Sequence, residues 1–433
     1  MNIYILNLYF FLAQFPSFFK LGSSNFGAHI FLLPILFFNK RVIKVSSLIY
    51  PIMLISIIWG FLNFQGNINI LEIILRIVSV QVALVGLIYP LEIAKKFNSK
   101  KEFFTFFVEK LLYLNIPTIS FLYLELIYKL TKSNQLYNLL FILKDFFIKG
   151  RSTHTIGTIS GFFPEHGMFV TYLLFLSGLS CIYIFFENTK RISFSKIMAF
   201  SWIFFLFFHQ SGLYLFSIFL IFLLISVLSI VHILIKRKVL KKLITKIIPF
   251  FIIFSVTCYY WLFYTQKFLF ERFEILFSLI NEYGLKTDRT IYFKSLPFII
   301  FSKLNIKELF FGSGVSQYTQ LVISKIKYLP QLLTNDLYFI SNVNRFPLNS
   351  LFVCQFIEYG LLGSIFIIFI LTKFQLIKPI SFTLFYANIF KNKPIFILSS
   401  LLFLGTFLSG FGAIPLMYPY TYLSIPMIIL ISE

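Results

Sequence analysis

The sequence predicts an all-α, polytopic integral membrane protein with about twelve transmembrane helices and one large outer loop. Hydrophobic residues make up 58% of the 433 residues and charged residues only 12%, which is too few charges to cover a water-soluble fold. The apolar runs recur along the whole chain at lengths that suit a bilayer. Lys and Arg gather at every second junction between these runs, as expected if the turns alternate between the two sides of a membrane.

The expected helices follow one another wherever an apolar run is long enough to cross the hydrocarbon layer. Their ranges are 3–19, 24–38, 44–63, 70–92, 106–128, 166–186, 194–209, 213–235, 246–264, 349–372, 395–411 and 420–432. The chain therefore divides into N-terminal membrane helices over 1–264, which include an outer segment at 129–165, a large extracytoplasmic loop over 265–348, and C-terminal membrane helices over 349–433.

The distribution of basic residues sets the orientation. With the N-terminus inside, the cytoplasmic turns receive the Lys and Arg clusters at 40–44, 95–101, 190–196, 236–246 and 373–393. The short outer turns contain only Lys20. The net charge of +22 is thus mostly a topology signal that also suits anionic membrane lipids. We expect no nucleic-acid partner, because the basic residues do not form one surface with interleaved aromatic side chains.

Cofactor motifs are missing from the sequence. Cys181, Cys258 and Cys354 have no paired spacing, so neither a disulfide framework nor a cysteine metal site is indicated. The patterns for nucleotide-driven transport, dinucleotide binding and zinc proteolysis do not occur, and no cofactor is expected.

The first apolar run lacks a basic start and a small-residue cleavage site, so we expect a retained anchor.

Both outer segments have an apolar periodicity of their own. Residues Leu136 to Ile148 recur at helical spacing, which predicts an amphipathic helix along the membrane interface. The large loop contains similar stretches at 268–280 and 291–301, together with ten basic and six acidic side chains. A loop of this length with internal periodicity is expected to form a small folded cap.

The densest group of ionisable residues occurs in the run 151–167, which enters the helix expected at 166–186. It contains Arg151, His154, Glu165 and His166 among three glycines. The glycines permit close approach to a ligand, and a proline before Glu165 suits a helix start. The run therefore predicts an acid/base pocket in which Glu165, His166 and His154 are the candidate catalytic groups. The alternative is that Glu165 only complements the helix dipole and that His166 faces solvent.

The large loop offers candidates for binding an anionic substrate. Arg289 and Arg345 are possible cations, and Gly312 and Gly314 flank Ser313 in a turn whose amides can face an anion. A plain turn, a surface ion pair of Arg289 and a headgroup anchor at Arg345 are the structural alternatives.

Glu125 is an acidic residue within a predicted membrane helix. Such a residue suggests a function by default, although its position near the outer end also permits simple contact with water. The sequence leaves both interpretations open.

Taken in order, these segments resemble the Wzy-type polymerases of the O-antigen polymerase and ligase family. The resemblance covers most of the chain and includes the many helices with a late outer loop. The similar segments are Gly161 to Gly167, which looks like the family's helix entry; Asp288-Arg289 followed by Leu309 to Gly314, which looks like its arginine and Gly-x-Gly pair; and Asn349 to Leu351 with Glu358 to Gly363, which looks like its Asn-x-x-Leu and Glu-x-Gly-Leu-x-Gly signature.

The resemblance implies a transferase that moves a growing glycan from undecaprenyl pyrophosphate onto a lipid-linked repeat unit, at the outer face of the bacterial inner membrane. Its implied partners are the lipid-linked oligosaccharide, membrane lipids and a chain-length regulator. Arg151, Arg289 and Arg345 would stabilise the leaving pyrophosphate. Glu165, or else His166 or His154, would serve as the base for the acceptor hydroxyl.

Two departures from the family pattern bear on the prediction. Leu348 stands where ligases of the group have His, which favours a polymerase over an O-antigen ligase. Ser211-Gly212 lacks the arginine that many members have there. The competing class is a lipid-linked oligosaccharide flippase or other secondary transporter, which predicts symmetry between halves and charges at mid-membrane depth. The sequence shows neither feature.

Overall fold

A computed structural model describes residues 3–15, 19–21, 24–64, 70–148, 159–163, 166–187, 193–206, 289–329, 334, 351–376, 394–409 and 419–432. The helices are α1 (Ile3–Leu12), η1 (Ala28–Leu32), α2 (Leu33–Phe37), α3 (Lys40–Phe64), α4 (Ile70–Ala94), α5 (Lys100–Leu114), α6 (Ile116–Thr131), α7 (Asn134–Ile148), α8 (His166–Phe186), α9 (Phe194–Phe205), α13 (Arg289–Ser302), α14 (Ile306–Phe311), α15 (Tyr318–Ser324), η6 (Ile326–Tyr328), α18 (Leu351–Lys373), α20 (Pro394–Leu408) and α21 (Pro419–Ser432). The strands β1 (Phe19–Leu21) and β2 (Ser24–Phe26) form an antiparallel hairpin.

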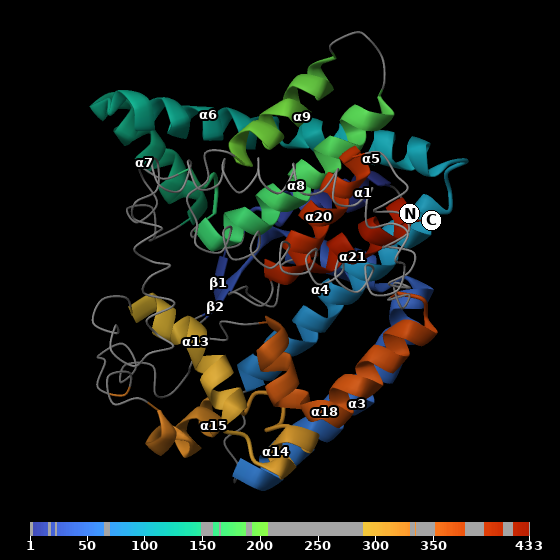
Figure 1. The fold of residues 1–433 in the computed structure, drawn as a ribbon, viewed down its shortest axis with the longest axis vertical. Helices are drawn as coiled ribbons and strands as arrows, with labels where there is room; N and C mark the ends of the chain where they lie inside the picture. The colour runs from blue at the N-terminus through green and yellow to red at the C-terminus, as the bar shows by residue number, and fades with distance from the viewer. Residues whose placement is uncertain are drawn as a thin grey trace, which may run out of the picture.

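The largest hydrophobic core lies among α1, α4, α5, α8, α9, α20 and α21 (Figure 1). Helix α8 is apolar around its whole circumference and contacts α5, α9, α20 and α21. A helix with that composition is stable only when every side is covered, so α8 occupies the centre. Its partners bury rings around Tyr172, which packs edge-on against Trp202 and Tyr420.

Helices α3 and α18 run side by side as a second group, and α13, α14 and α15 pack against α18 (Figure 1). Helix α3 also contacts α4, which joins this group to the main core. Large apolar side chains on α3 and α18 remain uncovered, for example Ile55 at 67% and Phe366 at 58% exposure. Lipid is the environment in which such faces are stable.

Four of the described helices are long and apolar enough to cross a membrane, namely α3, α4, α8 and α18. A fifth span results if the bent pair α5 and α6 is one. The helical class and the membrane character of the sequence prediction are thereby confirmed. The number of about twelve spans is not confirmed and stays a prediction. The expected helices at 213–235 and 246–264 lie outside the described residues.

The helix expected at 106–128 is two helices, with 55° between α5 and α6. The break falls at Asn115, the residue after α5, whose φ of −88° and ψ of 6° depart from helical values. Pro117 follows in the first turn of α6, where a backbone N–H has no partner within the helix, so its absence does not weaken α6. A proline also disfavours helical geometry in the residue before it, which favours a break between α5 and α6 over one straight helix. This break is a correction to the sequence prediction.

The first two expected helices also differ from the structure. The run 3–19 ends as a helix at Leu12, and the run 24–38 begins with β2 and a 3-10 turn before the short α2. Pro34 stands at the start of α2. Strand β1 pairs with β2 in the register Phe19 to Phe26, so a tight hairpin replaces the turn between two spans and adds strands to the all-α prediction.

Elsewhere the sequence boundaries agree closely with the structure. The helix expected at 166–186 is α8, and the amphipathic stretch 136–148 lies within α7. Within the large loop, the stretch 291–301 lies in α13, while 268–280 lies outside the described residues. The described part of the loop, 289–329, is helical and has a small core of its own with α18, as a folded cap requires.

Candidate functional site

The predicted site residues fall into three groups in the structure. Arg151, His154, Glu165 and Arg345 lie outside the described residues. His166 is the first residue of α8 and Arg289 the first of α13, and for these two the structure gives the backbone position alone. Gly312 and Gly314 are fully described, and they form the turn that begins the best-defined polar site.

The turn 312–317 is wedged between α3 and α18. Gly312 and Gly314 have φ of +75° and +96°, a region that L side chains rarely adopt. A Cβ on Gly312 would overlap the backbone of Glu358, and a Cβ on Gly314 would overlap Gly60 of α3. Both glycines are therefore required by close backbone approach as well as by their conformation.

Helix α18 is interrupted where the turn meets it. Gly360 has φ of +67° and ψ of −177° inside the helix, and its own missing Cβ gives space to Gly312. The break frees carbonyl groups that an unbroken helix would use internally. The amide of Ser313 donates to the Ile357 carbonyl at 2.8 Å, and that of Gly314 donates to the Glu358 carbonyl at 3.0 Å.

These bonds show what the amides of the Gly-Ser-Gly turn contact. The amide of Gly312 donates to the Glu308 carbonyl, and the next two amides donate to α18. All three amides thus have partners within the protein. The predicted role of Gly312 and Gly314 in substrate binding stays a prediction, and their observed role is to seat the turn.

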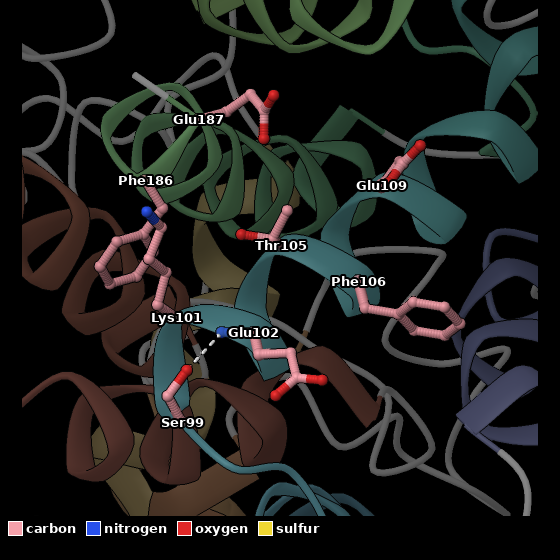
Figure 2. A pocket seen from close by; sticks show the side chains of 8 residues that line it. All are labelled: Ser99, Lys101, Glu102, Thr105, Phe106, Glu109, Phe186 and Glu187. Carbon is pink, nitrogen blue, oxygen red and sulfur yellow. Dashed lines mark hydrogen bonds between the residues drawn. The ribbon is translucent and has the colours of Figure 1, made fainter. Parts of the chain in front are cut away.

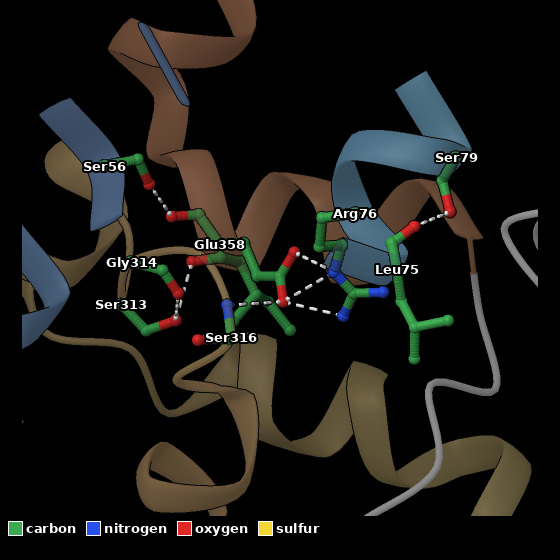
Figure 3. A network of polar contacts seen from close by, with 9 residues as sticks. Ser56, Leu75, Arg76, Ser79, Ser313, Gly314, Ser316 and Glu358 are labelled. Atoms are coloured by element: carbon green, nitrogen blue, oxygen red, sulfur yellow. Dashed lines mark hydrogen bonds and ion pairs between the residues drawn. The ribbon is translucent and has the colours of Figure 1, made fainter. Parts of the chain in front are cut away.

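A buried ion pair lies directly behind the turn (Figure 3). Arg76 of α4 donates from Nε to Glu358 Oε2 at 2.9 Å and from Nη2 to Oε1 at 2.8 Å. The Ser316 amide donates to the same Oε1 at 3.3 Å, and Ser56 of α3 donates its hydroxyl to the Glu358 carbonyl at 3.1 Å. Glu358 therefore joins α3, α4, α18 and the turn through one residue.

Two hydroxyl groups beside Glu358 are buried with no hydrogen-bond partner in the described part of the chain. They are Ser316 Oγ and Tyr318 Oη, on residues that are 5% and 2% exposed. Burial, with the nearby Cys354 and Glu358 adding to it, raises the pKa of Tyr318 well above its usual range. The phenol therefore stays protonated and can serve as a hydrogen-bond donor.

One end of the site is covered by aromatic and basic residues of α3 and α14. Trp59 donates its indole N–H to the Gly312 carbonyl at 3.1 Å and lies against Phe311, with 5.1 Å between the rings. Lys307 lies over the Trp59 ring at 4.8 Å and donates to Asn63 at 3.1 Å. These contacts pin the cap to α3.

Three separate sequence segments converge here. Leu296 and Ile300 of α13 share a buried cluster with Tyr318 of α15 and Ile357 of α18. The helix that begins at Arg289 is thereby packed against α15, which begins directly after the turn, and against the same broken helix. Among the segments on which the resemblance rests, 309–314 and 358–363 are in contact, because the Gly314 amide donates to the Glu358 carbonyl.

A hollow of about 550 Å³ lies away from this site, between α5 and the end of α8 (Figure 2). It is lined by three glutamates, Glu102, Glu109 and Glu187, together with Lys101. Ser99 accepts from the Glu102 amide at its edge and caps α5. None of the predicted site residues lines it. Among the described residues, no group of three His, Cys, Asp or Glu side chains is placed to hold a metal.

The sequence interpretation missed Arg76 and gave Glu358 no role. A signal for Arg76 was present, because an arginine inside an apolar membrane helix is costly and normally has a partner and a function. Glu358 appeared only as one letter of a segment. Its partner in α4 is 282 residues away, so no local pattern links the two.

No family model matches the chain, and no curated protein or solved structure is significantly similar to it.

Proposed function

We propose that the protein is a polysaccharide polymerase of the outer face of the bacterial inner membrane. It transfers a growing glycan from undecaprenyl pyrophosphate to the sugar hydroxyl of a lipid-linked repeat unit. The observation that carries the proposal is that α13 and the turn 312–317 both contact the broken helix α18, the turn by hydrogen bonds to Glu358 itself. These segments are among those that resemble Wzy-type polymerases. Residues of one active site must lie close together, and these segments do.

The proposed reaction is a displacement at the anomeric carbon of the donor sugar. The acceptor hydroxyl oxygen forms the new bond to that carbon while the bond from the carbon to the pyrophosphate oxygen breaks. Undecaprenyl pyrophosphate leaves with the electron pair, and the hydroxyl proton passes to a base. Glu165 is the proposed base, with His166 and His154 as the other candidates.

Fixed cations take the place of a metal in this proposal. The leaving group carries its negative charge before the reaction, so guanidinium groups that hold two phosphate oxygens stabilise its departure. Arg289, Arg151 and Arg345 have this role. Arg76 is different, because its Nε and Nη2 are already committed to Glu358.

A lipid-linked oligosaccharide flippase is the second candidate function. The break in α18 at Gly360 and the buried Arg76–Glu358 pair favour it, because transporters place interrupted helices and buried charges at their binding sites. An O-antigen ligase is the third candidate, and Leu348 argues against it.

A strain that lacks the gene separates these functions by its glycans. A polymerase mutant retains one repeat unit on its carrier outside the cytoplasm and loses long chains. A flippase mutant loses every outer-face intermediate, and a ligase mutant retains long chains on the lipid carrier. The second or third pattern would overturn the proposal.

The proposed sidedness has its own test. Lys101 and Lys327 are both exposed, the first at the start of α5 and the second in η6 of the cap. The basic-residue pattern places Lys101 inside and Lys327 outside. An impermeant maleimide applied to intact cells should label Lys327→Cys and leave Lys101→Cys unlabelled. Labelling of position 101 alone would reverse the orientation.

A further inference from the structure

A second buried cluster lies next to the segment that enters α8. Glu125 of α6 accepts two backbone N–H groups with Oε2, from Ser160 at 3.1 Å and from Gly161 at 2.9 Å. Its Oε1 lies 2.6 Å from Nζ of Lys144 in α7. Lys144 also donates to Ser160 Oγ at 3.0 Å. Two side chains from two helices therefore hold one short piece of backbone.

The surroundings of this cluster exclude water. Lys144 is completely buried, and Glu125 is 3% exposed. The ring of Phe121 lies 6.0 Å from the Lys144 ammonium and stacks on Phe162 with 4.7 Å between the rings. Charge interactions are stronger in such a place than at a surface, and an unpaired charge there is costly.

The segment 159–163 has few other polar anchors among the described residues. Within the segment, the Phe163 amide donates to the Ser160 carbonyl at 3.2 Å and closes a single turn. Gly161 has φ of +58°, and a Cβ there would meet only ordinary contacts. Phe163 packs against Tyr172 inside α8. The Glu125 carboxylate is thus the side chain that holds the backbone amides of this segment.

The pairing of Ser160 with Lys144 is not a nucleophile and its base. A lysine that activates a serine must accept its hydroxyl proton, whereas Lys144 Nζ donates to Ser160 Oγ at 3.0 Å and lies 2.6 Å from Glu125 Oε1. Ser160 is also completely buried and inaccessible to a substrate. The contacts suit a device that holds the backbone.

We propose that Glu125 and Lys144 are positioning residues that fix the backbone at Ser160 and Gly161 and thereby set the geometry of the helix entry at α8. This inference rests on the proposed function for its catalytic consequence, because Glu165 and His166 follow the held segment within a few residues. The sequence left the role of Glu125 open, and this proposal assigns it the role of holding the segment that leads to Glu165 and His166.

Hydrogen exchange tests the holding step without any assay of activity. In the full-length protein, Glu125→Gln and Lys144→Met should each raise the exchange rate of the Ser160 and Gly161 amides by about 10- to 100-fold, the range for a lost bond to a charged acceptor. The matched control is the pair Glu308 and Lys325, at 2.8 Å. Glu308→Gln with Lys325→Met should leave the exchange of 159–163 unchanged. Unchanged exchange in the Glu125 and Lys144 variants would overturn the proposal.

A kinetic test then distinguishes positioning from general stability. The double variant Glu125→Gln/Lys144→Met contains neither buried charge and should fold as well as the native protein. Its kcat per folded molecule should fall about tenfold or more with KM nearly unchanged, because the base is misplaced while donor binding remains. A native kcat in this variant would show that the pair only stabilises the fold.

The outcomes for the two proposals are separable. A native protein that makes no polymer from lipid-linked repeat refutes the proposed function. In that case the positioning proposal is tested by the rate at which a maleimide labels Glu165→Cys. The three native cysteines are replaced by alanine in this protein. The positioning proposal expects Glu125→Gln to change this rate several-fold, and an unchanged rate refutes it.

Discussion

In the part of the chain that the structure describes, two buried ion pairs each hold a glycine turn, and they do so by different means. At the first, Arg76 grips both oxygens of Glu358, and the turn 312–317 bonds mainly to the carbonyls of a broken helix. At the second, the amides of Ser160 and Gly161 both donate to the carboxylate of Glu125, which Lys144 supports from one side.

The comparison shows which part of each site is robust. Main-chain bonds from α18 keep the first turn seated even when the side chain of Glu358 changes, whereas the second turn loses both bonds with one carboxylate. The first pair therefore holds helices together, and the second holds the backbone at Ser160 and Gly161 in place. This difference predicts distinct consequences for substitutions that are similar on paper.

The largest expected effect comes from breaking the first pair. Arg76→Met leaves Glu358 buried and unpaired, and removal of one partner of such a pair typically costs about 3–5 kcal/mol. Unfolding of the purified protein in detergent should show this loss. Arg76→Met combined with Glu358→Leu should recover most of it, because no buried charge remains. A double variant as unstable as the single one would contradict the role given to the pair.

The next effect is on rate. Arg289→Ala should lower glycan transfer by about 10²- to 10³-fold, equivalent to about 2–4 kcal/mol, because one fixed donor to the leaving group is lost. Arg289→Lys should restore only a little, since an ammonium does not grip two oxygens. Chain-length ladders at equal protein level measure both. The matched control is Lys303→Ala, which removes a charge from the segment that follows α13.

A glycine contrast sharpens the comparison of the two turns. Gly314→Ala brings a Cβ into the Gly60 backbone, whereas Gly161→Ala meets only ordinary contacts. Both substitutions place an alanine at a positive φ, which destabilises each variant. Gly314→Ala should destabilise the protein by about 1–3 kcal/mol more than Gly161→Ala, because only its Cβ overlaps other atoms. Thermal unfolding of the two variants gives this difference directly. Equal destabilisation would mean that the first turn is not tightly seated against α3.

The smallest effect is expected at the pair Glu308 and Lys325. Both side chains are partly exposed, at 17% and 12%, and such pairs contribute about 0.2–1 kcal/mol. Lys325→Met should therefore change the unfolding temperature little. Glu308→Ala should cost somewhat more, because Glu308 also completes the capping box of α14 with Asn305.

The sequence alone predicts the elements whose cause is local. Helices α3, α4 and α8 follow from uninterrupted apolar runs, and α7 follows from its periodicity. The bend at Asn115 was also readable, because Pro117 stands in the middle of the run. The hairpin of β1 and β2 was not, since short runs that include Phe19 and Phe26 suit a helix or a strand equally.

The site could be predicted only in part, for a reason of distance along the chain. The turn at Gly312 and Gly314 is a local pattern and was found. Its partners were not, because Ser313 bonds to Ile357 and Glu358 bonds to Arg76 across long stretches of sequence. Glu125 was noticed as an anomaly, but the sequence gives no means of pairing it with Gly161, 36 residues away.

The central claim is that this protein joins lipid-linked glycan units, and reconstitution tests it most directly. The purified protein in liposomes receives an undecaprenyl-pyrophosphate-linked repeat unit as its only substrate. The account predicts a ladder of longer glycans with one undecaprenyl pyrophosphate released per bond formed. It also predicts that Glu165→Gln slows this transfer by about 10²-fold or more. Movement of the repeat unit across the bilayer without any longer product would contradict it and identify a flippase.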